Sequence, residues 1–205
     1  MDSLLIGTPC EGVEALSRAL GASFAPIPSL ADEAGFERWR AGAPGETSHE
    51  RVVVAAWLPQ PAPAPLLELD DSHWQQRGED PLLVWNAALA YAIERCRDGG
   101  ALVAVVEAPA PLDSAGWVPE AGVAEAVSAL TRSLALSEGP RGVRANTVTT
   151  PARLTRGAVV DPQPPLASFP GQLEDEVVGA VRMLLSTEAA GITGCALAAD
   201  CGRTW

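Results

Sequence analysis

Short, unbroken apolar runs alternate along this chain with longer stretches in which apolar residues recur every three or four positions. The runs predict strands buried on both faces of a sheet, and the longer stretches predict amphipathic helices. We expect strands over residues 4–7, 23–27, 51–57, 101–106, 143–148 and 195–199. We expect helices over residues 13–20, 31–40, 81–97, 118–137 and 173–185. Strands that alternate with helices in this way predict an α/β fold with a doubly wound parallel sheet between two helical layers.

Two proline-rich stretches interrupt this alternation without dividing the chain. Residues 59–65 and 151–170 are too rich in proline to supply ladder hydrogen bonds, so we interpret them as loops at the rim of the sheet. No composition shift or repeat separates two units, and the sequence therefore predicts a single domain over residues 1–205.

Composition and charge exclude several classes of function. The 14 basic residues, all of them arginine, stand against 26 acidic residues, which gives a net charge of −12. Such a chain has no electrostatic basis for binding nucleic acid or an anionic membrane surface. The four cysteines form no CxxC pair and lie beside no histidine, so neither a zinc site nor a redox dithiol is indicated. Without a membrane-length apolar stretch or a leader-like N-terminus, we expect a cytoplasmic protein.

Two stretches in the C-terminal half resemble the short-chain dehydrogenase/reductase family. They match a long helix with the strand after it, and then the last helix and strand of that family. The resemblance covers about residues 82–205 and fades upstream. It implies a Rossmann-like sheet with a shortened N-terminal half. The matching residues are Leu130–Ala135, Pro140–Val148, Glu174–Val178, Gly191–Gly194 and Asp200–Gly202.

The catalytic positions that the resemblance implies carry other side chains. The family's catalytic tyrosine corresponds to Glu120, its lysine to Ala124, and the strand end of its serine to Glu107. Only Asn86 matches, as a remnant of the family's helix asparagine. In the family the tyrosine exchanges a proton with the substrate and the lysine lowers the tyrosine's pKa. The chain contains no lysine and one tyrosine, Tyr91, so a shifted alignment does not restore this set and we expect no catalytic residues.

The cofactor-binding positions are changed in the same way. The glycine-rich turn of a dinucleotide site needs free backbone N–H groups at the start of a helix. Here Pro9 lacks an N–H, and Glu14 replaces the last glycine. The resemblance also puts Trp57 and Leu58 in the space of a nicotinamide ring, and leaves Thr155 as a weak remnant contact. We therefore expect no cofactor.

The leading hypothesis is a non-catalytic subunit that supports an active homologue. The chain retains the helices and the C-terminal tail that resemble the family's assembly surfaces, but it lacks the family's catalytic and cofactor-binding residues. We expect the chain to join a competent short-chain dehydrogenase subunit in a hetero-oligomer, or to pair with itself. The expected interface residues are Val127, Leu134, Arg203 and Trp205.

Three other functions stay open. A binding module would hold a small ligand in the old cleft and predicts an apolar pocket near Trp57, Trp117 and Glu107. A cofactor-independent acid/base enzyme would use Glu107 and Glu120, because two carboxylates can divide acid and base roles. The usual function of the family is that of an NAD(P)-dependent oxidoreductase. Of the four hypotheses, it is the one that the residues at the catalytic and cofactor-binding positions favour least.

Overall fold

The computed structural model describes residues 2–42, 48–59, 62–109, 115–151 and 173–202. Within these ranges, six parallel strands form one sheet in the order β2-β1-β3-β4-β5-β6. Only β2 lies beyond β1 on one side, whereas β3, β4, β5 and β6 follow β1 on the other side. This arrangement confirms the predicted Rossmann-like α/β fold. The strands are β1 (Ser3–Gly7), β2 (Ser23–Pro26), β3 (His49–Ala55), β4 (Cys96–Glu107), β5 (Arg144–Thr150) and β6 (Ala196–Ala198).

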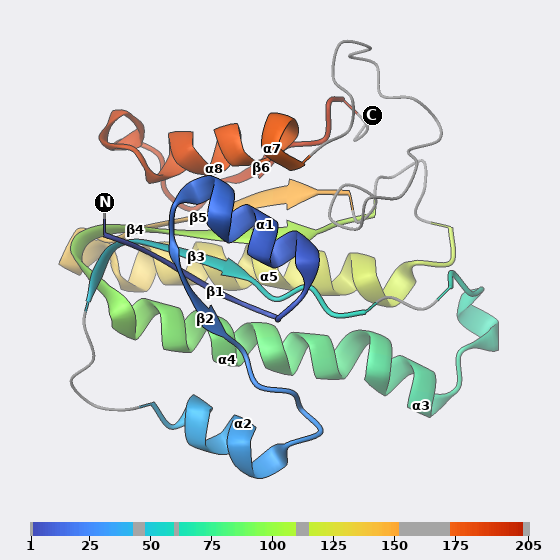
Figure 1. Cartoon of the computed structure of the whole chain (residues 1–205). Helices are drawn as coiled ribbons and strands as arrows, with labels where there is room; N and C mark the ends of the chain where they lie inside the picture. Colours follow the sequence, from blue (N-terminus) through green and yellow to red (C-terminus); the bar gives the residue numbers. More distant parts are fainter. Residues whose placement is uncertain (1, 43–47, 60–61, 110–114, 152–172, 203–205) are drawn as a thin grey trace.

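Helices cover both faces of the sheet (Figure 1). One layer contains α2 (Glu33–Arg40), α4 (Asp80–Arg95) and α5 (Val118–Ser137). The other contains α1 (Glu11–Leu20), α7 (Leu173–Glu176) and α8 (Val178–Leu185). Short helical turns precede α4, namely η1 (Leu66–Glu68), α3 (Asp71–Trp74) and the π-helical turn η2 (Gln75–Glu79), and two others are η4 (Gly139–Arg141) and η5 (Thr187–Ala189).

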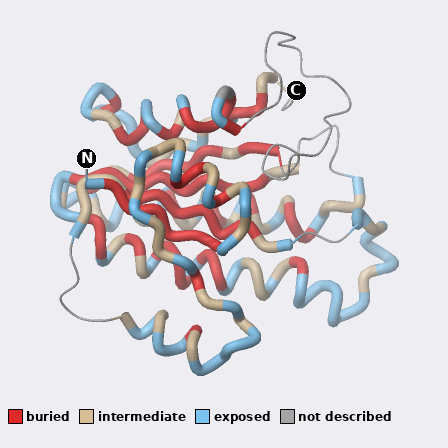
Figure 2. The backbone as a smooth tube through the Cα atoms, viewed as in Figure 1, coloured by how far each residue is buried: buried red, intermediate tan, exposed pale blue. Residues whose placement is uncertain are grey.

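The hydrophobic core lies on both faces of the central strands (Figure 2). Val52 to Val54 of β3 and Leu102 to Val105 of β4 are almost completely buried, which explains why these runs contain no alternating polar residue. Helix α4 contributes Trp85 and Ala88 to this core. No helix in the described ranges is long and apolar enough to cross a membrane.

Capping residues mark where several helices begin and end. Gly21 ends α1 in the left-handed conformation, with φ 65°. Asp32 caps the start of α2, and Asp70 caps the start of α3, accepting from the backbone N–H of His73 at 2.8 Å. These caps fix where the chain turns back toward the sheet.

Two predicted helices differ from the structure. The predicted helix over residues 81–97 begins at Asp80 and ends at Arg95, because Cys96 already pairs with His49 at the start of β4. The predicted helix over residues 173–185 is two helices, α7 and α8, separated at Val177. Most of the predicted loop over residues 151–170 lies outside the described residues.

Candidate functional site

The carboxyl ends of the strands meet at one edge of the sheet, where a doubly wound fold places its ligands. The chain leaves β1 toward β2 on one side and leaves β3 toward β4 on the other, so the strand order reverses between β1 and β3. Residues that follow Gly7, Ala55 and Glu107 therefore lie together at this edge.

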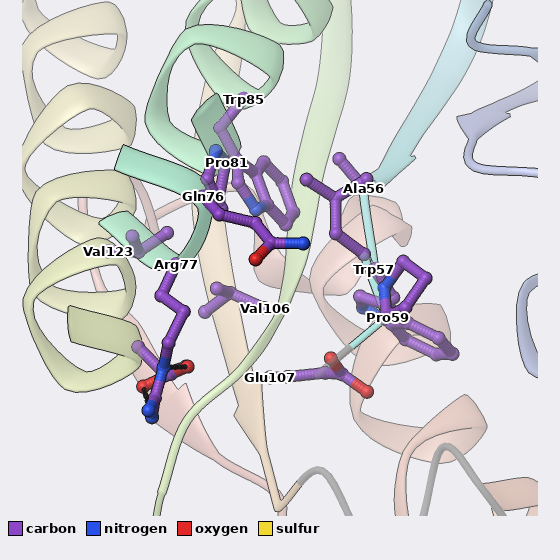
Figure 3. A pocket seen from close by; sticks show the side chains of 12 residues that line it. Ala56, Trp57, Pro59, Gln76, Arg77, Pro81, Trp85, Val106, Glu107 and Val123 are labelled. Carbon is purple, nitrogen blue, oxygen red and sulfur yellow. Dashed lines mark hydrogen bonds and ion pairs between the residues drawn. The ribbon is translucent and has the colours of Figure 1, made fainter. Parts of the chain in front are cut away.

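A pocket of about 440 Å³, counting the space open at its mouth, lies at this edge (Figure 3). It is bounded by the ends of β3 and β4 and by the first turns of α4 and α5. Among the described residues, the polar part of its wall is formed by Gln76, Arg77, Glu107 and Glu120. The apolar wall is formed chiefly by Ala56, Trp57, Leu58, Trp85, Val106 and Val123.

Arg77 and Glu120 form a buried ion pair at one end of the pocket. Arg77 Nε donates to Glu120 Oε1 at 2.7 Å, and Arg77 Nη2 donates to Glu120 Oε2 at 2.8 Å. The side chains are only 2% and 8% exposed. Both carboxylate oxygens thus accept a hydrogen bond from one guanidinium, in the bidentate geometry that is strongest for this pair.

The π-helical turn η2 carries Arg77 to this position. Five residues with i→i+5 pairing widen the helix between α3 and α4, and such insertions are frequent at functional sites. Arg77 Nη2 also donates to the carbonyl oxygen of Gly116 at 2.8 Å, and its guanidinium lies 5.6 Å from the Trp117 ring centroid. Arg77 therefore joins η2 to the start of α5. Trp117, which the sequence associates with the pocket, supports the ion pair from behind and does not line the cavity.

Glu107 is the last residue of β4 and is 8% exposed. Its carboxylate lies beside Trp57 and Pro59 on the pocket wall (Figure 3). In the sheet it pairs in register with Thr150 of β5. Glu107 and Glu120 thus both line the pocket, but they come from different elements and have different surroundings.

Trp57 is fixed at the end of β3 by two hydrogen bonds. Its indole Nε1 donates to the carbonyl oxygen of Val105 at 2.7 Å, and its own carbonyl oxygen accepts from Thr8 Oγ1 at 2.7 Å. The residue is 4% exposed. A buried indole that satisfies a strand carbonyl is a rigid part of the wall.

The turn between β1 and α1 uses its backbone donors internally. The N–H of Thr8 donates to the carbonyl oxygen of Ala55 at 3.2 Å, and the N–H of Cys10 donates to that of Thr8 at 2.8 Å. Pro9 between them has no N–H. Glu11 and Glu14 add two carboxylates to the first turn of α1. Three successive positions therefore offer no donor to an anion, and the helix N-terminus already carries negative charge.

Tyr91 lies away from the pocket. Its ring stacks on Trp39 of α2 with centroids 4.6 Å apart, and the Arg95 guanidinium lies 3.2 Å from its centroid. Ten residues separate it along α4 from Pro81, which lines the pocket, so it is displaced by about 15 Å along the helix axis.

The other predicted residues divide between surface, core and undescribed segments. Asn86 is exposed on α4, and Ala124 is buried in α5. Val127 is fully buried in this chain's own core, so it has no surface to offer a partner, while Leu134 is partly buried against that core. The remaining three, Thr155, Arg203 and Trp205, lie outside the described residues.

Sequence reasoning missed Arg77, Gln76 and Trp85 as site residues. The segment Gln75–Glu79 is polar and resembles a solvated turn, and no local signal indicates that one of its side chains turns inward. Trp85 belongs to an ordinary amphipathic pattern. Across the described part of the chain, no group of three or more His, Cys, Asp or Glu residues could hold a metal ion.

Comparison with known proteins supports the fold and the family. A family model described as enoyl-(acyl carrier protein) reductase matches residues 46–204. A short-chain dehydrogenase/reductase from Serratia marcescens has a TM-score of 0.73 and 18% identity, covering 100% of this chain and 98% of that chain. A short-chain dehydrogenase family protein from Francisella tularensis has a TM-score of 0.70 and 17% identity over 100% of this chain and 99% of that chain.

A blue fluorescent protein from a metagenomic library, solved in complex with NADPH, has a TM-score of 0.68 at 18% identity, over 100% of this chain and 98% of that chain. No curated protein is significantly similar in sequence. The chain belongs to the short-chain dehydrogenase/reductase family, because the family model spans most of its length.

Proposed function

We propose that this chain is a non-catalytic member of its family that associates with a catalytically competent homologue. The observation that carries the proposal is the position of Tyr91, the only tyrosine in a chain without lysine. Its ring is held between Trp39 and Arg95 on α4, not at the pocket. A tyrosine–lysine proton relay therefore has no residues from which to form.

The nucleotide end of the cleft supports the same proposal. Pyrophosphate binding at a helix start uses free backbone N–H groups. Here the donors of Thr8 and Cys10 are engaged, Pro9 has none, and Trp57 is fixed where β3 ends. This arrangement disfavours a bound nicotinamide dinucleotide, and the proposed subunit carries out no hydride transfer of its own.

The outer faces of α4 and α5 support the assembly part of the proposal. The family resemblance implies that these two helices pair with those of another subunit. Leu83 on α4 is 44% exposed and Leu136 on α5 is 79% exposed, both on the helix faces turned away from the buried positions. Large exposed apolar side chains on neighbouring helices are typical of interaction surfaces.

The test has two measurements on the purified chain. Titration with NADH and with NADPH is expected to give no saturable change in nucleotide fluorescence, with a competent homologue as the positive control. Native mass spectrometry after coexpression with a competent homologue is expected to show a mixed oligomer. Saturable nucleotide binding with carbonyl reduction would overturn the non-catalytic assignment, and exclusively separate species would overturn the association.

The pocket favours a second function, the binding of a small ligand without turnover. A pocket with two indoles and a few convergent polar groups has the composition of a ligand site. The acid/base enzyme hypothesis loses support from the same geometry, because both oxygens of Glu120 are bound by Arg77. Saturable stabilisation of the isolated chain by a small molecule tests the binding function.

A further inference from the structure

We propose that residues 65–76, which we call the arm, dock into an apolar groove with a basic rim on the partner subunit. This inference rests on the association with a competent homologue proposed above. It names the segment of this chain that makes the contact and the chemistry of the partner surface that receives it. Three features of the arm carry the inference: a neck that is tied to the start of α5, an apolar tip, and acidic flanks.

The arm is held closed at its neck by Gly116. The carbonyl oxygen of Gly116 accepts from the N–H of Ala64 at 3.1 Å before the arm and from Arg77 Nη2 at 2.8 Å after it. Gly116 has a φ of 80°, and a Cβ added there would lie 2.8 Å from the Ala64 nitrogen. The two ends of the arm are therefore close together, as in the compact surface loops that often carry function. A segment tied in this way loses little conformational freedom when it docks.

The arm presents apolar side chains to solvent. Every residue from 65 to 76 is exposed except Leu69, and Figure 2 shows the segment mostly in pale blue. Leu66 and Trp74 are among the exposed residues, and Leu67 is 98% exposed. Figure 1 shows η1 and α3, which form much of the arm, at the end of the molecule where α4 begins. Since Leu67 contacts so little of its own chain, a hollow on another molecule is needed to bury it.

The apolar tip continues onto the helical layer that the proposed association assigns to the partner subunit. A Cβ added at Gly78 would lie 3.8 Å from Trp74 Cε2 and 3.7 Å from Pro119 Cβ, so Trp74 adjoins the first turn of α5. That turn exposes Val118, and the first turns of α4 expose Leu83. The arm and the starts of both helices thus form one apolar surface. This continuity favours the partner subunit as the molecule that receives the arm.

The flanks of the arm are acidic. Residues 66–80 contain five acidic residues and one basic residue, Arg77, whose guanidinium is buried against Glu120. Glu68 and Asp71 are exposed on either side of the turn between η1 and α3. A second copy of this chain would bring a like-charged arm to the contact, which disfavours self-association through it. The complementary surface is an apolar groove bordered by arginine or lysine.

The first test removes the apolar tip. The full chain is coexpressed with the competent homologue, and dissociation constants are measured by analytical ultracentrifugation. Leu67→Ser is expected to weaken the mixed oligomer by about tenfold or more, because a buried leucine would be lost from the contact. The fold should be unaffected, since Leu67 is exposed, and an unchanged midpoint of thermal unfolding verifies this. Met183→Ser, an exposed apolar residue of α8, is the matched control, and an equal effect of the two variants would overturn the proposal.

The second test removes the acidic flanks. The double variant Glu68→Gln with Asp71→Asn is expected to weaken the mixed oligomer by about threefold to tenfold at low salt and to reduce its salt dependence. Glu11→Gln with Glu188→Gln is the matched control, because it removes the same charge from exposed positions on α1 and η5. Equal weakening by the two double variants would show attraction to the whole acidic protein and contradict a basic rim.

The third test detects the contact without a substitution. Hydrogen exchange followed by mass spectrometry is expected to be slower for residues 65–76 in the mixed oligomer than in the chain alone. Unchanged exchange in the arm of an intact mixed oligomer would overturn this inference and leave the association in place. If the wild-type chain forms no mixed oligomer, the association itself is removed, so the two failures are distinguishable.

Discussion

At the scale of single residues, the ion pair between Arg77 and Glu120 shows how burial determines what a charged side chain does. Each partner is desolvated, and each recovers much of that cost from the other, while Arg77 also donates to the carbonyl oxygen of Gly116. The pair is therefore sensitive to the loss of one member and tolerant of the loss of both. It fixes η2 to α5 and sets one end of the pocket.

Arg77→Met is expected to lower the free energy of unfolding by about 3–5 kcal/mol, because Glu120 is left buried and unpaired. The double variant Arg77→Met with Glu120→Met is expected to recover most of this loss. Urea denaturation followed by circular dichroism measures both. The exposed pair of Arg18 and Glu14, at 3.8 Å, is the control, and Arg18→Met should cost less than about 1 kcal/mol. Equal losses at the two sites would contradict this account.

Burial also controls the chemistry of Cys96, which is fully buried at the start of β4. Desolvation raises the pKa of its thiol to about 11. We expect Cys96 to resist iodoacetamide at pH 8 in the folded protein, while the half-buried Cys10 is modified, because the thiolate is the reactive form. Mass spectrometry of the digested protein measures the modification of each cysteine. Modification of Cys96 at the rate of Cys10 would contradict the prediction.

The same pKa gives a pH dependence of stability. The thiol pKa is raised from its ordinary value of 9.0 to about 11 in the folded protein, so between these values the folded state retains a proton that the unfolded state has lost. The free energy of unfolding is therefore expected to be independent of this group below about pH 9 and to fall between about pH 9 and 11. Urea titrations of the native chain and of Cys96→Ala at pH 8 and pH 10.5 test this, since the fall should be smaller in the variant.

At the scale of elements, the end of β1 packs closely against α1 and the end of β3. A Cβ on Gly7 would lie 2.5 Å from Val13 Cγ1 and 2.8 Å from the carbonyl oxygen of Ala55. Gly7 therefore serves the contact of β1 with α1 and β3. The glycine of a nucleotide-binding turn and a glycine of close packing look the same in the sequence, and only the surrounding donors distinguish them.

Gly7→Ala is expected to destabilise the protein by about 1–3 kcal/mol, because the backbone oxygen of Ala55 cannot yield without breaking the sheet. Gly122→Ala in the interior of α5 is the matched control, since no atom lies within 4 Å of its added Cβ. That variant should be stabilised by about 0.5–1 kcal/mol through helix propensity. Thermal unfolding measures both changes, and a neutral Gly7→Ala would contradict the packing argument.

The elements that the sequence predicts best are those with a strong periodic pattern. The predicted helix over residues 118–137 has the bounds of α5, because its apolar stripe and its following glycines agree. The π-helical turn η2 was not predicted, since its residues Gln75–Glu79 carry no periodic signal and the partner of its buried Arg77, Glu120, lies on a distant element.

At the scale of the whole molecule, the two helical layers present different surfaces. The layer of α4 and α5 exposes Leu83, Val118 and Leu136, whereas α8 on the opposite face exposes Met183. The proposed association assigns the first layer to a partner subunit. Val127, expected at that interface, lies inside the chain instead, because its position on α5 faces the sheet.

Leu83→Glu and Leu136→Glu are each expected to weaken assembly with the homologue by about tenfold or more, since a carboxylate would be buried between apolar helices. Met183→Glu on α8 is the matched control and should leave assembly unchanged. Dissociation constants from analytical ultracentrifugation of the coexpressed proteins measure the effect. Equal weakening by all three variants would place the contact elsewhere.

The sequence by itself determined the alternation of strands and helices, the absence of lysine, and the family resemblance, because these depend on periodicity, composition and local motifs. Only the tertiary structure decided what Glu120 and Arg77 do. They are separated by 43 positions in the sequence, and their hydrogen bonds exist because η2 and α5 pack together. The N–H group of Thr8, just after β1, likewise depends on Ala55 of β3, more than 40 residues away. The local pattern of apolar and polar residues determines the helices and strands. The partner of a buried polar group depends instead on which helices and strands the fold brings into contact.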